Sequence, residues 1–283
     1  MARRIIKEIA QELFGEESIG IVNSMDIIGD IAVIKAENIE TKKLETFGEK
    51  LLERIGYINV VLRQITPVEG EYRLRRFQHI AGEDRRWTIY REHGIILKVD
   101  IEKVYFTPRL STERKRIMKL VNPGEEICNM FAGVGPYSIL IAKYRSPKLV
   151  HSIDINRYAV DYHIENNFLN KVEDRIIVYR GDAGEMIEKY IVGRCDRVLM
   201  PLPEKALDYI DYALEALRHI GYIHIYLHIP YEKTWREALP KAVEEASKAL
   251  RGKCEIDMME PHKVREVGPR LLQVCVDTKV TKY

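Results

Sequence analysis

Apolar residues in the first hundred positions alternate between helical spacing and short continuous runs. Helical spacing at residues 5–14 and 39–55 predicts two amphipathic helices, because side chains three or four positions apart share one helix face. Short apolar runs predict three strands, at residues 19–22, 31–34 and 60–62. We therefore expect a small α+β unit at this end of the chain.

A second pattern, residues 87–99, predicts a hairpin that turns at His93-Gly94. Beyond it, Ser111 or Thr112 is expected to cap a helix at residues 113–120. The rest of the chain alternates strand and helix. Strands are predicted at residues 149–153, 176–179, 197–200 and 222–228, and helices at 158–168, 184–190, 204–218 and 231–250.

The last two predicted strands, residues 254–259 and 271–277, have no helix between them. Alternating strands and helices are typical of a parallel sheet, whereas strands joined without a helix pair antiparallel. We expect an α/β fold in which a mostly parallel sheet ends in an antiparallel strand. The predicted domains are residues 1–100, the small α+β unit, and residues 101–283, the sheet domain.

The stretch at residues 129–137, Asn-Met-Phe-Ala-Gly-Val-Gly-Pro-Tyr, lies between an apolar strand and an apolar helix. Gly133 and Gly135 lack a Cβ, so the backbone can turn tightly there and approach a ligand closely. The next strand ends in Asp154, and a carboxylate at that position suits the two hydroxyls of a ribose. The pattern predicts a site for a cofactor that contains a nucleoside.

A second acid, Asp182, follows the strand at residues 176–179 and suits an adenine amino group. The third glycine of the dinucleotide pattern is absent, since Ser138 holds that position and Pro136 follows Gly135. Two acids without a phosphate-binding turn favour a nucleoside that carries no phosphate. S-adenosylmethionine is such a molecule, and it is the cofactor that we expect.

Composition sets the class of protein. The chain has 283 residues, 31% of them charged and 46% hydrophobic, which is typical of a globular protein. We expect no membrane span, no secretory signal and a cytoplasmic location. No two cysteines have C-x-x-C spacing, so we expect no metal and predict buried free thiols at Cys128, Cys195, Cys254 and Cys275.

Charge is unevenly distributed. Residues 73–119 carry thirteen Lys or Arg against six Asp or Glu, whereas the whole chain has a net charge of only +2. Arginine outnumbers lysine nine to four in this segment, and its planar guanidinium suits phosphates and stacked bases. The segment favours a nucleic-acid partner; a solvated surface rich in salt bridges is the alternative.

Two prolines, Pro201 and Pro203, follow the strand at residues 197–200. They predict a rigid turn at the sheet edge where ligands of such folds bind. A plain stop between strand and helix is the alternative.

Several segments together resemble the archaeal and eukaryotic tRNA (guanine-37, N1)-methyltransferase family and its wyosine-pathway relatives. The matching segments are residues 73–83 (Arg-Leu-Arg-Arg-Phe-Gln-His-Ile-Ala-Gly-Glu), 104–114 (Val-Tyr-Phe-Thr-Pro-Arg-Leu-Ser-Thr-Glu-Arg), 130–137, 153–156 and 196–203. The resemblance implies a Rossmann-like class I methyltransferase sheet preceded by a small α+β domain that contacts RNA. Many members carry a further N-terminal RNA-binding domain, and we expect this chain to begin at the family's middle domain.

Carried over by position, the resemblance implies that Glu113 is the general base and that Arg73 steadies O6 of the target guanine. The residues that it places at the cofactor, together with those of the glycine turn, are Arg114, Phe131, Gly133, Gly135, Asp154, Ile155, Asp182, Ala183 and Pro201. The candidates for substrate contact are Arg109, Pro201, Pro203, Tyr137 and His79. Core packing is the alternative for Tyr137, and a structural hydrogen bond is the alternative for His79.

The chain departs from the family pattern at two positions. Asn129 replaces an acid, and Pro201 replaces the asparagine of an Asn-Leu-Pro loop, which is compatible with a wider range of target bases such as 4-demethylwyosine. The expected activity is methyl transfer to N1 of guanosine-37 in the tRNA anticodon stem-loop, by a monomer. The alternatives are an aminocarboxypropyl transferase of the wyosine pathway and an RNA-binding protein with a decayed methyltransferase site.

Overall fold

The computed structural model describes the whole chain except residues 1, 16–21, 37–38, 68 and 71. It divides into two compact units, Met1–Pro108 and Arg109–Tyr283. The boundary expected after residue 100 falls inside the first unit. Among the helices that the structure describes, none combines the length and the apolar composition that a bilayer crossing requires.

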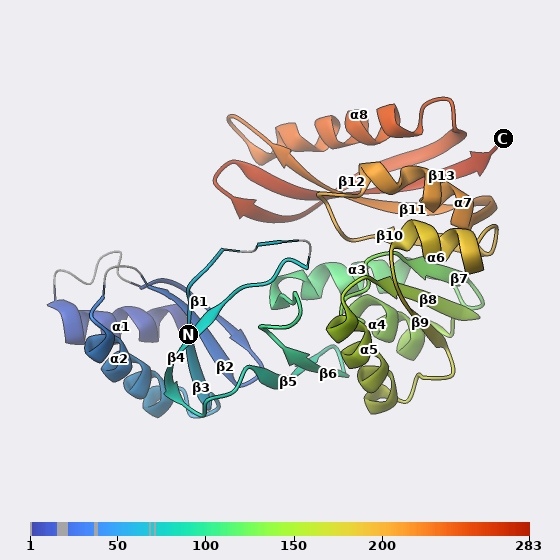
Figure 1. The fold of residues 1–283 in the computed structure, drawn as a ribbon. Coiled ribbons are helices and arrows are strands. Elements are labelled where there is room, and N and C mark those ends of the chain that lie inside the picture. Colours follow the sequence, from blue (N-terminus) through green and yellow to red (C-terminus); the bar gives the residue numbers. More distant parts are fainter. Residues whose placement is uncertain (1, 16–21, 37–38, 68, 71) are drawn as a thin grey trace. The chain divides into compact units, whose positions relative to one another are not determined.

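The first unit is a four-stranded sheet with two helices packed on it, and Figure 1 shows its elements in blue and cyan. The strand order is β1-β2-β3-β4, in which only the β2–β3 pair is parallel. Its elements are α1 (Ala2–Phe14), β1 (Val22–Ile28), β2 (Ile31–Ala36), α2 (Thr41–Arg54), β3 (Val60–Gln64) and β4 (Phe77–Gly82).

Apolar faces of α1 and α2 form the core of this sheet. Ile9 from α1 and Leu44 and Phe47 from α2 are fully buried in one cluster with Ile34 and Val61 of the strands. Full burial of each such side chain contributes about 1.5–3 kcal/mol of transfer free energy. The two amphipathic helices predicted in this unit are therefore confirmed as α1 and α2. The strand expected at residues 19–22 lies mostly outside the described residues; the described strand begins at Val22.

The predicted hairpin is confirmed as β5 (Trp87–Glu92) and β6 (Ile95–Asp100), with Glu92 opposite Ile95. His93 and Gly94 both have positive φ, 44° and 76°, which is the backbone of a tight two-residue turn.

The second unit is built on a seven-stranded sheet of order β12-β13-β11-β10-β7-β8-β9. Its five strands from β7 to β11 run parallel, and β13 pairs antiparallel with both β11 and β12. The predicted α/β sheet with an antiparallel end is thereby confirmed. The strands are β7 (Glu126–Asn129), β8 (Leu149–Asp154), β9 (Ile176–Arg180), β10 (Cys195–Met200), β11 (Leu217–Pro230), β12 (Cys254–Gly268) and β13 (Leu271–Lys282).

Helices lie on both faces of this sheet (Figure 1). Apolar residues of α6, α7 and α8 share one buried cluster with the strands, and the four cysteines are buried and free as predicted. The helices are α3 (Ser111–Leu120), α4 (Pro136–Arg145), α5 (Arg157–Asn170), α6 (Ala183–Tyr190), α7 (Ile210–Ala216) and α8 (Ala238–Leu250).

Helix bounds differ from the prediction in three places. Neither Ser111 nor Thr112 caps α3; its N-cap is Leu110, because a 3₁₀ turn, Pro108–Leu110, leads directly into the helix. The helix expected from residue 231 begins at Ala238, after a 3₁₀ turn that starts with a capping box from Thr234. The helix expected at residues 204–218 is shorter too, since β11 already begins at Leu217.

Candidate active site

The candidate site lies at the carboxyl ends of the parallel strands in the second unit. Strand order reverses at β7, since β8 lies on one side of it and β10 on the other. In open α/β sheets the crevice at such a reversal is where ligands bind. The glycine turn after Asn129, the acid Asp154 and the proline turn after Met200 all leave the sheet at this edge.

Asp154 ties the glycine turn to the neighbouring strand. Its Oδ2 accepts the backbone N–H of Gly133 at 2.7 Å, and its Oδ1 accepts that of Asn156 at 2.9 Å. Burial raises the pKa of this carboxyl, and the two backbone hydrogen bonds oppose that rise. Each carboxylate oxygen keeps a further lone pair, so Asp154 can still accept from two hydroxyls.

Gly135 is the residue from which α4 begins, and no larger residue fits there. Its φ is +88°, and a Cβ at this position would stand 2.3 Å from Cδ2 of His163. His163 is fully buried on α5, and burial lowers its pKa to about 3, so the imidazole is neutral at physiological pH. The neutral imidazole of His163 thus packs against the glycine turn and occupies the space that a side chain at position 135 would need.

Asn129, which stands where the family pattern has an acid, is fully buried at the end of β7. Its Nδ2 donates to Oγ of Ser138 at 3.0 Å, and Ser152 donates to the same oxygen at 2.7 Å. Among the residues that the structure describes, Oδ1 of Asn129 meets no hydrogen-bond donor. A buried acceptor without a donor is uncommon in native structures and suits a ligand that brings one.

Asp182 caps α6. Its Oδ1 accepts the backbone N–H of Gly184 at 2.8 Å and that of Glu185 at 3.3 Å, and its Oδ2 accepts the hydroxyl of Tyr209. The ring of Tyr209 meets that of Phe131 edge to face, with centroids 5.3 Å apart. The second acid is therefore joined through Tyr209 to a residue of the glycine turn.

Glu113 stands in the first turn of α3 with 6% of its surface exposed. Arg116 forks onto it, with Nε 2.8 Å from Oε2 and Nη2 2.7 Å from Oε1. The hydroxyl of Tyr226 on β11 donates to Oε1 at 2.7 Å, and that of Tyr137 donates to Tyr226 at 3.2 Å. Tyr137 follows the glycine turn directly, so these bonds link the Glu113 carboxylate to the start of α4.

Burial raises the pKa of Tyr137 and of Tyr226, so both phenols stay protonated donors. Tyr137 is 4% exposed and contributes its hydroxyl to this chain of hydrogen bonds. Its ring face is therefore packed in the unit rather than presented at the surface.

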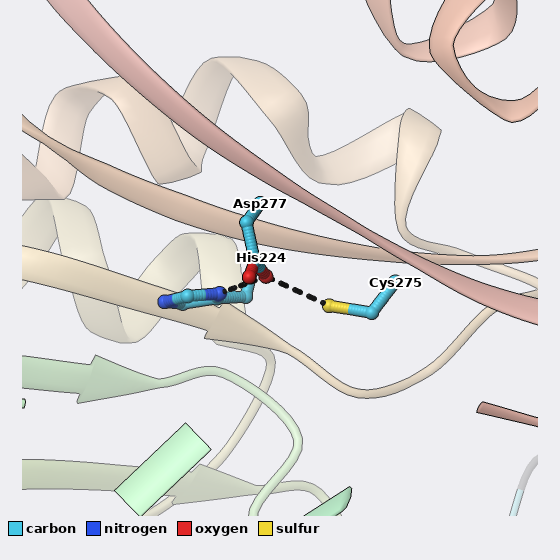
Figure 2. Close-up of side chains that lie close together, drawn as sticks. All are labelled: His224, Cys275 and Asp277. Carbon is cyan, nitrogen blue, oxygen red and sulfur yellow. Dashed lines mark hydrogen bonds and ion pairs between the residues drawn. The ribbon is translucent and has the colours of Figure 1, made fainter. Parts of the chain in front are cut away.

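A cluster of possible metal ligands, His224, Cys275 and Asp277, lies on β11 and β13, with its ligand atoms within 4.8 Å of one another (Figure 2). These atoms already have protein partners. Nε2 of His224 accepts from Arg197, and Arg116 donates to both oxygens of Asp277. Burial also raises the pKa of the Cys275 thiol well above its ordinary value. A metal requires a thiolate and would face two guanidinium groups, so the cluster is suited to hydrogen bonding instead.

Residues expected at the cofactor occupy several settings in the second unit. Arg114 and Ala183 are buried, whereas Ile155 is 41% exposed beside Asp154. Pro201 and Pro203 are both half-buried in the turn after β10.

The candidates for substrate contact are more scattered. In the first unit, the guanidinium of Arg73 lies 4.6 Å from the ring centroid of Tyr105. His79 bonds to the carbonyl of Gly82 at 3.1 Å, which is the structural alternative for this residue. Arg109 is exposed in the second unit.

Several residues of the site were not found from sequence. His163, Arg116 and Tyr226 each contact a residue that was expected, and Asp277 contacts Arg116. Only Arg116 carried a usable signal, its spacing of three residues from Glu113 on a predicted helix. The others are brought to the site from distant parts of the chain.

Comparison with known families shows the fold and the family of the chain. Residues 88–257 match the TRM5/TYW2 methyltransferase domain, and residues 6–85 match the TYW2 N-terminal domain. A parallel sheet with a glycine turn and strand-end acids defines the broader class of nucleoside-binding α/β transferases. Within that class, the chain belongs to the TRM5/TYW2 methyltransferase family.

Curated relatives include methyltransferases and an aminocarboxypropyltransferase that act on position 37 of tRNA. A tRNA (guanine(37)-N(1))-methyltransferase Trm5b from Pyrococcus abyssi is 37% identical over 91% of this chain and 75% of its own length. A tRNA 4-demethylwyosine(37)-methyltransferase Taw21 from Saccharolobus solfataricus is 35% identical over 90% and 93%. A tRNA(Phe) (4-demethylwyosine(37)-C(7)) aminocarboxypropyltransferase from Methanocaldococcus jannaschii is 30% identical over 89% and 96%.

Solved structures resemble the chain over nearly its full length. The complex of aTrm5 with tRNALeu matches with a TM-score of 0.83 and 34% identity, over 98% of this chain and 78% of that one. Trm5 from Methanocaldococcus jannaschii in complex with adenosine matches with a TM-score of 0.80 and 33% identity, over 98% and 80%.

Proposed function

We propose that this protein transfers a methyl group from S-adenosylmethionine to N1 of guanosine-37 in tRNA. The observation that carries the proposal is the buried Glu113 carboxylate, held by Arg116 and Tyr226 and joined through Tyr137 to the glycine turn. The proposal is supported by the Trm5b relative, whose name states this reaction, and by a relative's complex with tRNA.

The residues of the second unit fit S-adenosylmethionine. Asp154 retains acceptor capacity for two ribose hydroxyls, and Ile155 offers an exposed apolar surface for a purine face. Oδ1 of Asn129 is a buried acceptor that suits an ammonium donor. We assign Asp182 to the adenine amino group, and we assign Arg114, Phe131, Ala183 and Pro201 to the same cofactor site.

When bound, S-adenosylmethionine supplies an electrophilic methyl group on sulfur. The protein must remove the proton from guanine N1, because a protonated N1 is a poor nucleophile. As the bond from sulfur to methyl breaks and the bond from N1 to methyl forms, Glu113 receives the N1 proton on a carboxylate oxygen. Acceptance of a proton by a positioned carboxylate typically raises the rate of the chemical step by about 10²–10⁴-fold.

Loss of the N1 proton places negative charge on guanine O6. Arg73 is assigned to that oxygen as a hydrogen-bond donor, a role of the oxyanion-hole type. Pro201, Pro203 and Arg109 are assigned to the everted base and its flanking nucleotides, because chemistry on a base requires it to leave the stack.

The tRNA partner is further supported by the first unit, whose residues we assign to RNA contact. Its hairpin carries an indole, Trp87, that is 46% exposed between two cations, with Arg85 5.3 Å and Lys98 5.8 Å from its ring centroid. An exposed aromatic flanked by cations is suited to stacking on a base near a phosphate.

The test is single-turnover methylation of a tRNA with guanosine at position 37. Glu113→Gln should slow the chemical step by about 10²–10⁴-fold and leave cofactor binding intact, because the amide keeps the shape but does not accept the proton. The matched control is Glu126→Gln, which also removes a buried, ion-paired carboxylate. Glu126 is the first residue of β7, at the strand end away from the glycine turn. A loss of the same size in both variants, or an unchanged rate in Glu113→Gln, would contradict the assignment.

A second candidate function is aminocarboxypropyl transfer to 4-demethylwyosine. It is favoured by the match of residues 6–85 to the TYW2 N-terminal domain and by a relative with that name. The mass added to tRNA carrying either base separates the two reactions. Absence of any product, together with no heat on titration of S-adenosylmethionine, would indicate a decayed site.

A further inference from the structure

Glu113 is one end of a buried line of charges and hydrogen bonds that crosses from α3 to the sheet. Arg116 reaches two carboxylates: it forks onto Glu113, and its Nη1 and Nη2 also donate to Asp277 on β13. Asp277 is 5% exposed. Figure 2 shows Asp277 between His224 and Cys275, bonded to both. The guanidinium of Arg116 is thus shared by two anions.

The protonation of His224 follows from its partners. Its Nε2 lies 2.7 Å from Nη1 of Arg197, and a guanidinium can only donate, so Nε2 must be the acceptor. The proton of a neutral imidazole is then on Nδ1, where it donates to Asp277 at 2.6 Å. Burial lowers the pKa of His224, which keeps the ring neutral.

Arg197 anchors the far end of this line. Its Nε donates to Glu125 at 2.7 Å, and its Nη2 donates to the carbonyl of Leu120, the last residue of α3, at 3.0 Å. The helix that carries Glu113 is therefore tied to the sheet at its middle through Arg116 and at its end through Arg197.

We propose that Asp277, oriented by His224, is a positioning residue for the methyl-transfer step: it keeps Arg116 paired when Glu113 takes up the proton from guanine N1. This inference rests on the proposed function. A protonated Glu113 no longer neutralises Arg116. If Glu113 were its sole counter-ion, proton uptake would leave the half-buried guanidinium of Arg116 without an anionic partner. Asp277 is a second counter-ion already in place, so Arg116 stays paired after the uptake.

The hydrogen bonds of Asp277 keep it anionic for this role. Burial by itself would raise its pKa, but the hydrogen bonds from His224 and Arg116, together with the positive charge of Arg116, outweigh burial and lower the pKa of Asp277. Among the described residues, the groups that face Glu113 are Arg116 on α3, Tyr226 on β11 and, within electrostatic range, Tyr137 on α4 and Cys275 on β13. The groups that face Asp277 are Arg116 on α3, His224 on β11, His262 on β12 and Cys275 on β13.

The test is the pH profile of the single-turnover rate with S-adenosylmethionine and guanosine-37 tRNA. In Asp277→Asn, Arg116 has only Glu113 as a counter-ion, so the carboxylate holds the N1 proton less readily. The plateau rate should fall by about tenfold, and the acid limb should move to lower pH by about one unit, the smaller end of the effect of a charge within 4–6 Å.

A double variant, Arg116→Gln with Asp277→Asn, removes both charges together and leaves the buried Glu113 carboxylate without its cationic partner. Its acid limb should move to higher pH than that of Asp277→Asn. The control Asp257→Asn, an exposed acid on β12 that accepts from Thr281, should leave the limb in place. Thermal unfolding of every variant checks that it is folded.

The inference is supported if the acid limb moves to lower pH in Asp277→Asn and lies at higher pH in the double variant than in Asp277→Asn. Slower rates with unmoved limbs in both variants would overturn it and show that the line of charges only fastens α3. A wild-type protein that transfers no methyl to tRNA would overturn the proposed function itself, and with it this inference. The two failures are therefore distinct.

Discussion

At the residue scale, the site depends on positions where one atom more or fewer changes what can fit. Gly135 combines a left-handed backbone with a face pressed against His163, so it is fixed for two reasons. Gly124 has a similar φ, +81°, but a Cβ there would meet nothing within 4 Å. Substitutions at Gly124 and Gly135 therefore separate the cost of backbone strain from the cost of steric overlap.

We predict that Gly124→Ala costs about 1–2 kcal/mol in the free energy of unfolding, the penalty of a left-handed residue with a Cβ. Gly135→Ala should cost about 1–3 kcal/mol more, since the imidazole of His163 must move. It should also weaken binding of S-adenosylmethionine, whereas Gly124→Ala should not. Urea unfolding and calorimetric titration measure these effects. Equal losses of stability in the two variants would show that the contact with His163 carries no cost.

At the scale of elements, the first residues of three helices determine where the candidate site residues lie. Helix α6 starts at a carboxylate, α4 at a glycine turn, and α3 at a 3₁₀ turn that places Glu113 in its first turn. A negative side chain at a helix start is stabilised by the free N–H groups there. The same residues that begin these helices thus face the carboxyl edge of the sheet.

We predict that Asp182→Ala destabilises the second unit by about 1–2 kcal/mol, because α6 loses its cap. Asp182→Ser should cost less than about 0.5 kcal/mol, since a serine hydroxyl also caps a helix. Serine has no second oxygen, so both variants should bind S-adenosylmethionine more weakly. Thermal unfolding and titration calorimetry separate the two roles. Unchanged affinity in Asp182→Ser would limit Asp182 to capping.

At the scale of the whole molecule, the chain is two compact units with separate cores. All the cofactor residues proposed here belong to the second unit, and Arg73 belongs to the first. The chain has two tryptophans, and each unit holds one: Trp87 in the first and Trp235 in the second. Each indole can therefore report on one unit.

We predict that S-adenosylmethionine at 100 times its dissociation constant stabilises the second unit by about 2.7 kcal/mol, because it binds only the folded state. In Trp87→Phe, the remaining Trp235 fluorescence should show a later urea transition when the cofactor is added. In Trp235→Phe, the Trp87 transition should not move. A shift of the same size in both variants would show that the two units unfold as one.

Local signals in the sequence located most elements and the edge of the sheet at which the candidate site lies. The glycine turn at Gly133 and Gly135 and the strand-end acids Asp154 and Asp182 were recognisable because each stands at the end of a strand that the local apolar pattern marks. The hairpin at His93-Gly94 and the apolar helix faces are equally local. The start of α3 was misplaced, because its cap is a preceding 3₁₀ turn rather than a side chain.

Only the tertiary structure decided which side chains surround Glu113. Tyr226 lies 113 positions from it along the chain, and Asp277 lies 161 positions from Arg116. No local pattern marks such partners, because β11 and β13 present alternating side chains throughout and the register of the sheet selects the ones that meet. The sequence thus determined the chemistry that is present, and the fold determined which charges stand together.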